Sequence, residues 1–318
     1  MMKKWTAVLL CCLTLLSFSA CSGDQSNGQG ESAPPVSSTD PAGTPDKQKV
    51  SVTFDAMAEF AKAVGGDRVE VSTIIPTGTE PHDFEPKAQD LTGLSEANIF
   101  VYNGLGMEAW ADEAISAASN ENLVVVEASQ GADAIVNTDA EEAAEHGQYD
   151  PHIWLSLKGA ELAATNIRDG LVQSDPANQK YYEQNCNDFV AQLESLYQQY
   201  TEKFQSVEKK SFVTGHAAFA YLCRDFGLEQ KSVEDTFAEG EPTAQQLTEL
   251  IEYCKANQVT TVFAEEMASP EVSQTLADEV GAAVVPIYTM ESAQDGMSYL
   301  ERMESNLSKI YDSLLSRT

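Results

Sequence analysis

Hydrophobic and polar positions follow one another along most of the chain in blocks typical of strands and helices in turn. Short runs rich in valine and isoleucine predict strands, and apolar residues spaced three and four apart predict helices between them. The predicted strands are residues 49–54, 69–75, 98–104, 123–128, 211–215, 260–265 and 282–288. The predicted helices are residues 57–64, a stretch after 87, 107–118, 247–257 and 272–280. This alternation predicts an α/β fold with parallel sheets covered on both faces.

A long helix divides the pattern into two halves. An Asp-Pro pair at 175–176 provides a cap and a first-turn proline, and the helical pattern continues to about Val207. A helix of about 30 residues is roughly 45 Å long at 1.5 Å per residue. Its apolar residues recur on one face: Tyr182, Cys186, Phe189, Leu193, Leu196 and Tyr200. The pattern therefore predicts two α/β lobes, residues 49–174 and 209–318, joined by one rigid helix, residues 175–208, with a cleft between the lobes.

The first twenty residues have the features of a signal peptide rather than of a fold. Two lysines precede an apolar run, residues 7–16, that is too short to span a bilayer, and small residues follow it. A cysteine directly after such a cleavage site resembles the bacterial lipoprotein signal, in which Cys21 would be acylated. Phe18 departs from this pattern, which usually carries an aliphatic residue there. An ordinary secretory signal followed by an unrelated cysteine is the alternative.

The segment after this cysteine predicts a tether. Residues 22–48 are almost free of apolar side chains and rich in Gly, Ser and Pro. Such a segment cannot bury enough surface to offset its ordering entropy. We therefore expect a lipidated Cys21 and a disordered tether over residues 21–48. They would anchor an exported protein to the outer face of the bacterial cytoplasmic membrane.

The charge of the chain narrows the range of partners. Its 318 residues include 19 basic and 50 acidic side chains, a net charge of −31. Nucleic acid phosphates and anionic lipid headgroups would repel such a chain, which excludes nucleic-acid binding. A cation is the partner that it attracts most easily, although an acidic surface that keeps the protein soluble accounts for most of the charge.

Three cysteines remain after Cys21: Cys186, Cys223 and Cys254. An odd number in an exported protein allows one internal disulfide and a remaining thiol. Cys223 and Cys254 both fall on helical patterns in the second half of the chain, so they are the predicted pair. None of the three has the CxxC spacing of a metal site.

Three of the four histidines lie in similar local settings: His82 in TEPHDFEP, His152 in YDPHIWLSL and His216 in VTGHAAFAYL. His82 and His216 follow the carboxyl ends of predicted strands, where open α/β sheets build binding sites. His152 follows an Asp-Pro pair, which favours a turn. Neutral imidazole suits Zn²⁺, and three of them leave one position for a carboxylate or water. A hydrogen-bonded histidine in a turn is the alternative at each position, and spacing alone does not decide between the two.

Four segments resemble marker segments of a known family: PHDFEP, DPHIWLSL, GHAAFAYLCRDFGL and VFAEEMASPEVSQTLADEVGA. In this order they are similar to the zinc/manganese substrate-binding lipoproteins of bacterial ABC importers, cluster A-I, and to its zinc-type receptors in particular. The similarity runs from about Lys49 to the C-terminus. The resemblance implies two α/β lobes joined by one long helix, with a metal site in the cleft between them.

The resemblance also implies that His82, His152 and His216 are metal ligands. Members that favour manganese or iron usually carry a carboxylate at the position of His216. A histidine there implies zinc, which agrees with the preference of imidazole for this metal.

The fourth ligand is where the chain departs from the family pattern. The family often places an aspartate where this chain has Tyr288, and tyrosine would have to lose its proton to bind a metal. Glu291, three residues later, is the predicted ligand, because some zinc-binding members use a glutamate there. Water or another acidic residue, such as Glu80 or Asp83, is the alternative.

Two other acidic stretches need an interpretation. The loop at 139–150 contains His146, and zinc-type members often carry a histidine- and acid-rich loop here that gathers or senses metal. A solvated loop without a specific role is the alternative that we favour. Glu265 and Glu266 end a predicted strand. Adjacent residues on a strand point to opposite faces, so these two are not a catalytic pair.

The sequence therefore predicts a receptor rather than an enzyme. It would capture Zn²⁺ as its transported ligand and deliver it, as a membrane-anchored monomer, to an ABC permease and its ATPase. The chain has no P-loop of its own. A manganese or iron receptor of the same family is the first alternative, and a surface adhesin is another. An exported zinc hydrolase is the alternative from a different class, against which stands the absence of an HExxH motif from the sequence.

Overall fold

The computed structural model describes residues 47–137, 143, 147–236, 243–266 and 270–315. They form two parallel four-stranded sheets with helices around them, which confirms the predicted fold class. Within these ranges, no helix combines the length and the apolar character needed to cross a membrane. The predicted signal peptide, Cys21 and His146 lie outside the described residues.

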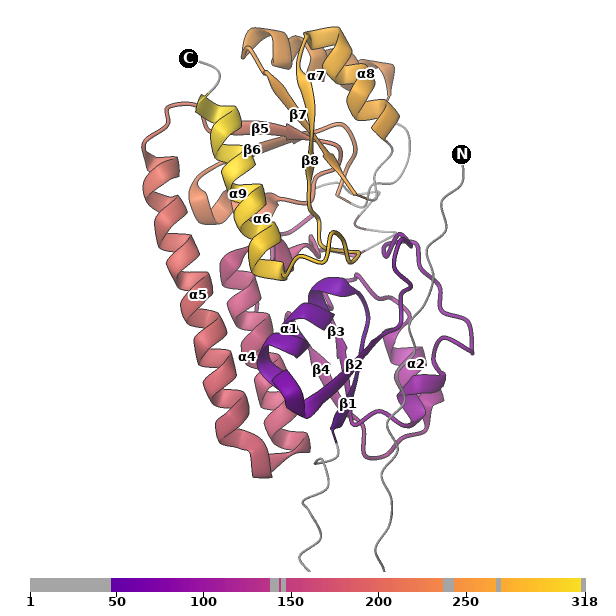
Figure 1. Ribbon diagram of the computed structural model, residues 1–318. Helices are drawn as coiled ribbons and strands as arrows, with labels where there is room; N and C mark the ends of the chain where they lie inside the picture. The colour runs from indigo at the N-terminus through magenta and orange to yellow at the C-terminus, as the bar shows by residue number, and fades with distance from the viewer. Residues whose placement is uncertain (1–46, 138–142, 144–146, 237–242, 267–269, 316–318) are drawn as a thin grey trace, which may run out of the picture. The chain divides into compact units, whose positions relative to one another are not determined.

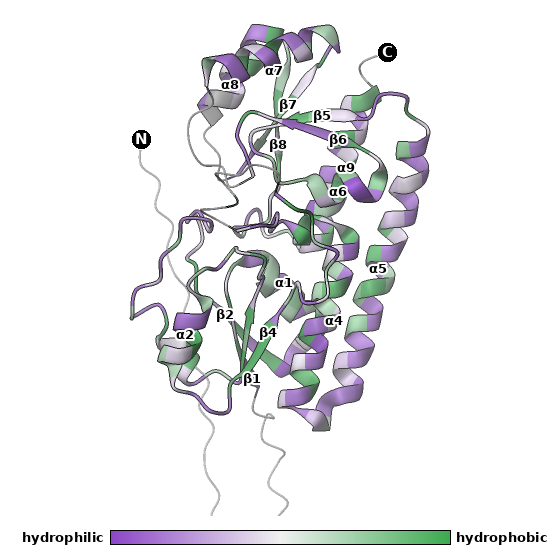
Figure 2. Cartoon of the chain, turned by 180° about the vertical axis from the view of Figure 1, so that it is seen from behind, coloured by the Kyte–Doolittle hydropathy of each residue, from purple (hydrophilic) through white to green (hydrophobic). Residues whose placement is uncertain are grey.

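The first sheet has the strand order β2-β1-β3-β4. Its strands are β1 (Gln48–Val52), β2 (Val69–Thr73), β3 (Ile99–Tyr102) and β4 (Val124–Glu127). Val50 aligns with Val71 on one side and with Ile99 on the other, and all pairs are parallel. Figure 2 shows that β4 is mainly hydrophobic, as expected of a strand in a parallel sheet that helices cover. The predicted tether reaches residue 48, where β1 begins.

The helices of this lobe are α1 (Asp55–Gly65), α2 (Ala111–Ala118) and α4 (Leu157–Ser174). Residues of α1 at spacings of three and four, among them Met57, Phe60 and Val64, are fully buried. The helix ends before Gly66, whose positive φ of 51° suits glycine. The amino terminus of α4 is capped by Ser156, which accepts a hydrogen bond from the Gly159 amide.

The second sheet repeats the arrangement of the first, with the order β6-β5-β7-β8. Its strands are β5 (Ser211–Thr214), β6 (Glu229–Ser232), β7 (Thr261–Glu265) and β8 (Ala283–Ile287). Its helices are α6 (Ala220–Phe226), α7 (Ala244–Ala256), α8 (Pro270–Val280) and α9 (Tyr299–Leu315). The hydrophobic pattern predicted three of these strands. It missed β6, since the sequence EQKS contains no apolar residue.

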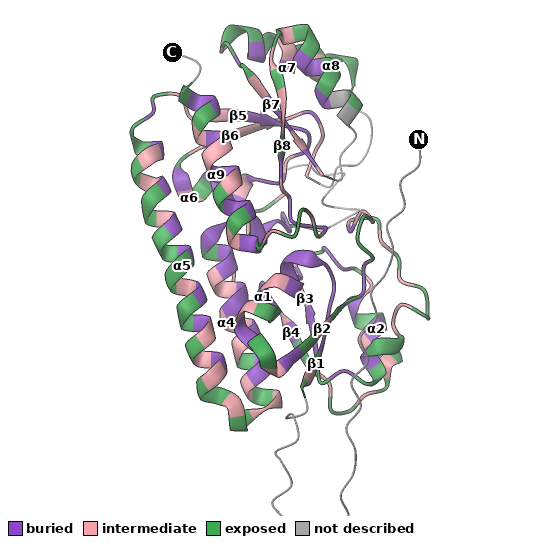
Figure 3. Ribbon diagram, in the orientation of Figure 1, coloured by how far each residue is buried: buried purple, intermediate pink, exposed green. Residues whose placement is uncertain are grey.

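The long helix α5 (Gln179–Gln205) follows a single 3₁₀ turn, η4 (Pro176–Asn178). All six residues of the predicted apolar face are buried. The helix packs against α1 and α4 of the first lobe and against α6 and α9 of the second. Figure 3 shows that β3 is buried whereas much of α5 and α7 is exposed. The helix thus connects the two sheets and buries one side against both lobes.

Three further 3₁₀ turns complete the described elements: η1 (Gly66–Arg68), η2 (Thr92–Ser95) and η3 (Ile153–Leu155). The helix predicted after residue 87 is wrong, because only η2 forms there. The Asp90 side chain accepts a hydrogen bond from the Lys87 amide, and Gly93 follows; both features favour turns over a continuous helix.

The predicted disulfide between Cys223 and Cys254 is also wrong, since no disulfide joins any of the three described cysteines. Cys223 packs into the main core, which includes residues of α5. Cys254 packs into a separate cluster with Val213 and Leu250. A helical pattern places each cysteine on an apolar face, but it does not show which core that face meets.

Candidate metal centre

The structure brings together the four predicted residues His82, His152, His216 and Glu291. One possible ligand atom from each lies within 4.8 Å of the others. The first lobe supplies His82 and His152, and the second supplies His216 and Glu291. Three of the four residues are buried, and His82 is partly exposed.

The spacing of the ligand atoms suits a single zinc ion. The His152 Nε2 atom lies 3.1 Å from Nε2 of His82 and 3.4 Å from Nε2 of His216. Zinc binds imidazole nitrogen at about 2.0–2.1 Å in a tetrahedral site, which places neighbouring ligand atoms about 3.3 Å apart. The Glu291 Oε1 atom lies 3.9 Å from Nε2 of both His82 and His152. A small movement of this side chain would bring Oε1 to the spacing that a fourth zinc ligand needs.

The turn before η3 fixes the orientation of His152. One carboxylate oxygen of Asp150 accepts hydrogen bonds from the His152 amide, at 2.9 Å, and from ring atom Nδ1, at 2.8 Å. The hydrogen on Nδ1 leaves Nε2 unprotonated, which is the form that binds a metal. The sequence analysis missed this role of Asp150, although an aspartate two residues before a histidine in a DPH turn is a local signal for it.

His216 lies in the loop between β5 and α6, whose backbone is held by a buried carboxylate. Glu265, at the end of β7, accepts hydrogen bonds from the amides of Gly215 and His216. A Cβ atom at Gly215 would lie 2.2 Å from the carboxylate, so only glycine permits this approach. The His216 carbonyl accepts hydrogen bonds from the side chains of Thr214 and Gln230, both at 2.7 Å. The loop is therefore fixed on both sides of the ligand.

Glu291 lies in the loop between β8 and α9, which Glu266 holds in the same manner. Glu266 accepts hydrogen bonds from the amides of Thr289 and Met290, both at 2.8 Å. Met290 has a φ of 62°, a conformation that methionine rarely adopts and that the surrounding bonds must maintain. The Thr289 hydroxyl donates to Oε2 of Glu291 at 2.8 Å. The other oxygen, Oε1, is buried and has no hydrogen-bond partner among the described residues, which suits it to a metal.

Glu265 and Glu266 thus face different loops, as expected for neighbours on a strand. The sequence analysis expected the two side chains to point apart, but it missed the role of each residue in positioning a predicted ligand. No local signal identifies this role, because the bonded partners lie about 50 and about 24 residues away along the chain.

The loop that carries Glu291 is also bonded to the first lobe. The Ala56 amide, at the start of α1, donates to the Met290 carbonyl at 3.1 Å. The Trp154 indole donates to the Thr289 carbonyl at 2.7 Å. Glu291 is therefore covalently part of the second lobe and is attached by hydrogen bonds to the first.

A buried ion pair lies behind this loop. Arg302 of α9 donates to the Asp55 carboxylate of α1 at 2.6 Å and to the Ser292 carbonyl at 3.1 Å. The Arg302 side chain is 1% exposed. The pair links the two lobes directly, next to the segment that carries Glu291.

Burial sets the protonation of the cluster. It lowers the pKa of His216 well below the usual value, and the neighbouring His152 lowers it further, so His216 is neutral and can bind a metal. Burial raises the pKa of Glu291 well above its usual value, and the nearby Glu80 adds to the effect. Burial also raises the pKa of Glu265, to about 8. A cation at the cluster would compensate for the buried negative charge of ionised Glu291.

The other possible fourth ligands lie elsewhere. The group of possible metal ligands in the described ranges contains Glu291 but neither Glu80 nor Asp83. Glu80 accepts a hydrogen bond from the His82 amide at 3.2 Å. The Tyr288 hydroxyl donates to Asp295 at 3.0 Å, so the residue at the usual aspartate position bonds outside the cluster.

Comparison with known proteins places this geometry in a family. Residues 50–313 match the family model described as zinc-uptake complex component A, periplasmic (ZnuA). The chain is 35% identical to the high-affinity zinc uptake system protein ZnuA of Bacillus subtilis (strain 168), over the full length of both. It is 43% identical to a protein of Treponema pallidum (strain Nichols) named for metal binding, over 84% of this chain and 87% of that one. A crystal structure of a zinc-bound ZnuA deletion mutant superposes with a TM-score of 0.75 at 34% identity and covers 85% of this chain and 98% of the other.

Proposed function

We propose that the chain is a zinc receptor. It belongs to the ZnuA family of periplasmic zinc-uptake components, as its four marker segments predicted. It binds Zn²⁺ outside the cytoplasm through His82, His152, His216 and Glu291. It then delivers the ion to an ABC permease that a separate ATPase drives. The chain itself is a binding protein and not an enzyme, and it acts as a monomer tethered through lipidated Cys21.

The observation that carries this proposal is the spacing of the four ligand atoms. Nitrogen–nitrogen distances of 3.1 and 3.4 Å correspond to the edges of a zinc tetrahedron. Three imidazoles and one carboxylate favour zinc over manganese, which prefers sites richer in oxygen.

The same observation weighs against a zinc hydrolase. Catalytic zinc sites keep one position open for water, whereas sites with four protein ligands are closed. In the proposed site Glu291 takes the fourth position, and this residue is 4% exposed. A buried site with four protein ligands suits the capture of an ion.

The test is a titration of the metal-free protein with Zn²⁺ and with Mn²⁺ against a chelator of known affinity. We expect one tight zinc site per chain and much weaker manganese binding. His216→Ala should weaken zinc binding by more than the roughly 10–100-fold typical of residues behind the ligands. His146→Ala, which removes the fourth histidine, should leave the affinity unchanged and is the matched control.

The outcomes separate the alternatives. Manganese binding tighter than zinc binding would assign the protein to the manganese or iron receptors. The absence of a tight site for either metal would refute the proposal and mean that the histidines are structural. If His146→Ala and His216→Ala weakened zinc binding equally, the site would not be the proposed cluster.

A further inference from the structure

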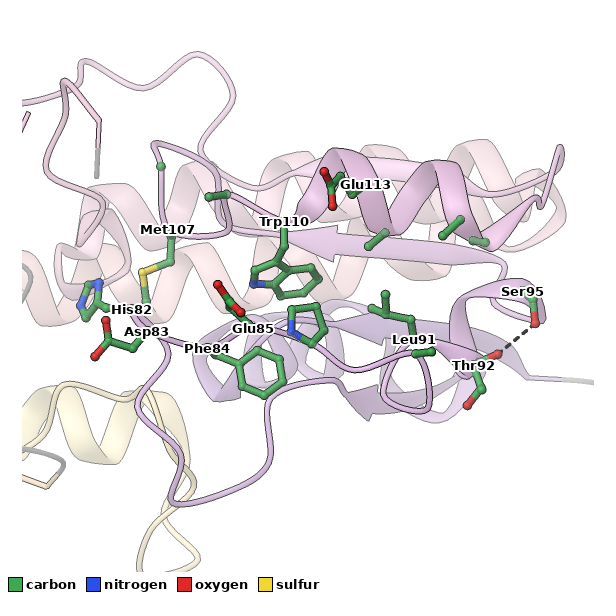
Figure 4. A pocket seen from close by; sticks show the side chains of 17 residues that line it. His82, Asp83, Phe84, Glu85, Leu91, Thr92, Ser95, Met107, Trp110 and Glu113 are labelled. Atoms are coloured by element: carbon green, nitrogen blue, oxygen red, sulfur yellow. Dashed lines mark hydrogen bonds between the residues drawn. The ribbon is translucent and has the colours of Figure 1, made fainter. Parts of the chain in front are cut away.

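The three histidines of the metal cluster differ in their surroundings. His82 lines a pocket of the first lobe, together with Met107 and Trp110 (Figure 4). His152 and His216 do not line this pocket, and they are 0% and 3% exposed. Because these two residues come from different lobes, the 3.4 Å spacing between their Nε2 atoms depends on buried contacts that join the lobes.

The hydroxyl of Tyr221 makes such a contact. Tyr221 is fully buried and lies in α6, the helix that begins four residues after His216. Its hydroxyl donates a hydrogen bond to the Asp150 carbonyl at 2.7 Å and accepts one from the Ile135 amide at 3.1 Å. Both backbone groups belong to the first lobe, and Asp150 is the residue that orients the ring of His152.

The segment that carries His152 is bonded to α6 both before and after the ligand. Before it, the Asp150 carbonyl accepts the bond from α6. After it, the Ser156 hydroxyl donates to the Asp225 carboxylate of α6 at 2.5 Å. Ser156 also caps α4, so its replacement would have two effects, whereas the Tyr221 hydroxyl bonds only to the two backbone groups of the first lobe.

We propose that Tyr221 is a positioning residue for the metal cluster, whose hydroxyl sets the distance between His152 and His216. It acts through Asp150 and does not touch the ion. The bond to Asp150 has to break before His216 can move away from His152, so the hydroxyl slows the release of zinc. This role depends on the proposed zinc function, because it concerns the spacing of two proposed zinc ligands.

The first test compares Tyr221→Phe with Tyr200→Phe. Each change keeps the aromatic ring and the cation above it, Arg224 at 5.0 Å from the Tyr221 ring and Lys203 at 4.1 Å from the Tyr200 ring. The Tyr200 hydroxyl also donates to a backbone carbonyl, that of Glu304 in α9, so its loss is a matched control outside the cluster.

Zinc affinity is measured by competition with a chelator, and the dissociation rate is measured after an excess of chelator is added. We expect Tyr221→Phe to raise the zinc dissociation constant about tenfold, mainly through faster dissociation, as for other residues that support metal ligands. Tyr200→Phe should change neither value. Equal effects of the two variants would mean that the loss of any buried hydroxyl weakens the site, and would overturn the proposal.

A second test asks whether the hydroxyl acts through Asp150. If it does, adding Tyr221→Phe to Asp150→Asn should weaken zinc binding less than about threefold, because the carboxylate that the hydroxyl positions is already absent. The same factor in both backgrounds would show that Tyr221 acts independently of Asp150, which contradicts the proposal.

A third test needs no variant and so does not depend on how well Tyr221→Phe folds. If breaking the hydroxyl bonds favours zinc release, zinc must in turn favour the bonds. Zinc should therefore slow hydrogen exchange at the Ile135 amide, and equal exchange with and without zinc would overturn the proposal. Tight zinc binding that Tyr221→Phe leaves unchanged would refute the role of Tyr221 alone. The absence of tight binding by the unmodified protein would refute the proposed function as well.

Discussion

In the first lobe a carboxylate orients the ring of His152, whereas in the second lobe two carboxylates hold the backbone around the predicted ligands. Asp150 fixes the imidazole of His152 directly, at 2.8 Å. In the second lobe, Glu265 and Glu266 bind amide groups of the ligand loops. The two lobes repeat the same strand order and yet prepare their ligands by different means.

The two lobes also differ in whether a predicted ligand lacks a hydrogen bond in the metal-free protein. In the second lobe, Oε1 of the predicted ligand Glu291 is buried without a hydrogen-bond partner among the described residues. An unsatisfied buried polar atom costs about 1–3 kcal/mol. The second lobe therefore contains a carboxylate oxygen that a bound ion would stabilise, whereas the ring of His152 in the first lobe is already oriented in the metal-free protein.

The largest expected effect concerns the link between the lobes. Arg302→Met leaves Asp55 buried without its partner, and breaking a buried ion pair costs about 3–5 kcal/mol. Urea unfolding of the metal-free protein should show this loss. Adding Asp55→Asn should recover part of it. An exposed ion pair contributes at most about 1 kcal/mol. If Arg302→Met lowers the free energy of unfolding by less than this amount, the pair does not stabilise the contact between the lobes.

The next effect compares two buried carboxylates that bind backbone amides, one in each lobe. Glu108 of the first lobe accepts from the amides of Asn103 and Gly104, and burial raises its pKa to about 7. Because the folded state favours the protonated form, stability is greatest below the unfolded pKa and falls as the pH rises towards 7. The loss is on the order of 3 kcal/mol. Burial raises the pKa of Glu265 to about 8, so this residue adds to the loss of stability and continues it to about pH 8.

Unfolding of the metal-free protein at several pH values measures this fall. Glu108→Gln removes the contribution of this carboxylate alone, so stability should fall less steeply up to pH 7, and the fall due to Glu265 should remain up to about pH 8. A curve that is flat from pH 5 to 8 in the unmodified protein would contradict the expectation.

A smaller effect concerns the side-chain bond in the first lobe. Asp150→Asn keeps one acceptor for the ring but removes the charge, and such partners of metal-binding histidines are worth about 10–100-fold in affinity. The zinc dissociation constant should rise by that factor. Asp188→Asn, on the exposed side of α5, is the control. An equal effect of both variants would mean that Asp150 acts through net charge alone.

The smallest effect concerns the second lobe. Glu266→Ala removes both acceptors for the amides of Thr289 and Met290, so the left-handed conformation of Met290 loses its support. We expect zinc to bind about tenfold more weakly and to dissociate faster, because the change acts on a ligand through its backbone. Glu266→Gln keeps one acceptor and should recover part of the affinity. If Glu266→Ala weakened zinc binding more than Asp150→Asn does, the backbone support in the second lobe would matter more than the side-chain bond in the first.

The sequence predicted the lobes and the four clustered residues better than it predicted what supports them. Strands with apolar runs and the long helix were found because their periodicity is local. The strand β6 was missed because it has no apolar residue. The disulfide prediction was wrong because the two cysteines belong to different cores. Asp150 lies two residues from its histidine and could have been recognised. Glu265 and Glu266 act across about 50 and about 24 residues, a relation that only the folded chain reveals.

The double attachment of the Glu291 loop determines how the cluster would come apart. Its bonds to Ala56 and Trp154 hold the loop against the first lobe. A separation of the sheets that preserves these bonds would withdraw His216 alone and leave three of the four side chains in place. An ion coordinated there would pass from four protein ligands to three in a single step and gain an open position. A transporter that pulls the second lobe outward would thus need to detach one imidazole, not to dismantle the whole site.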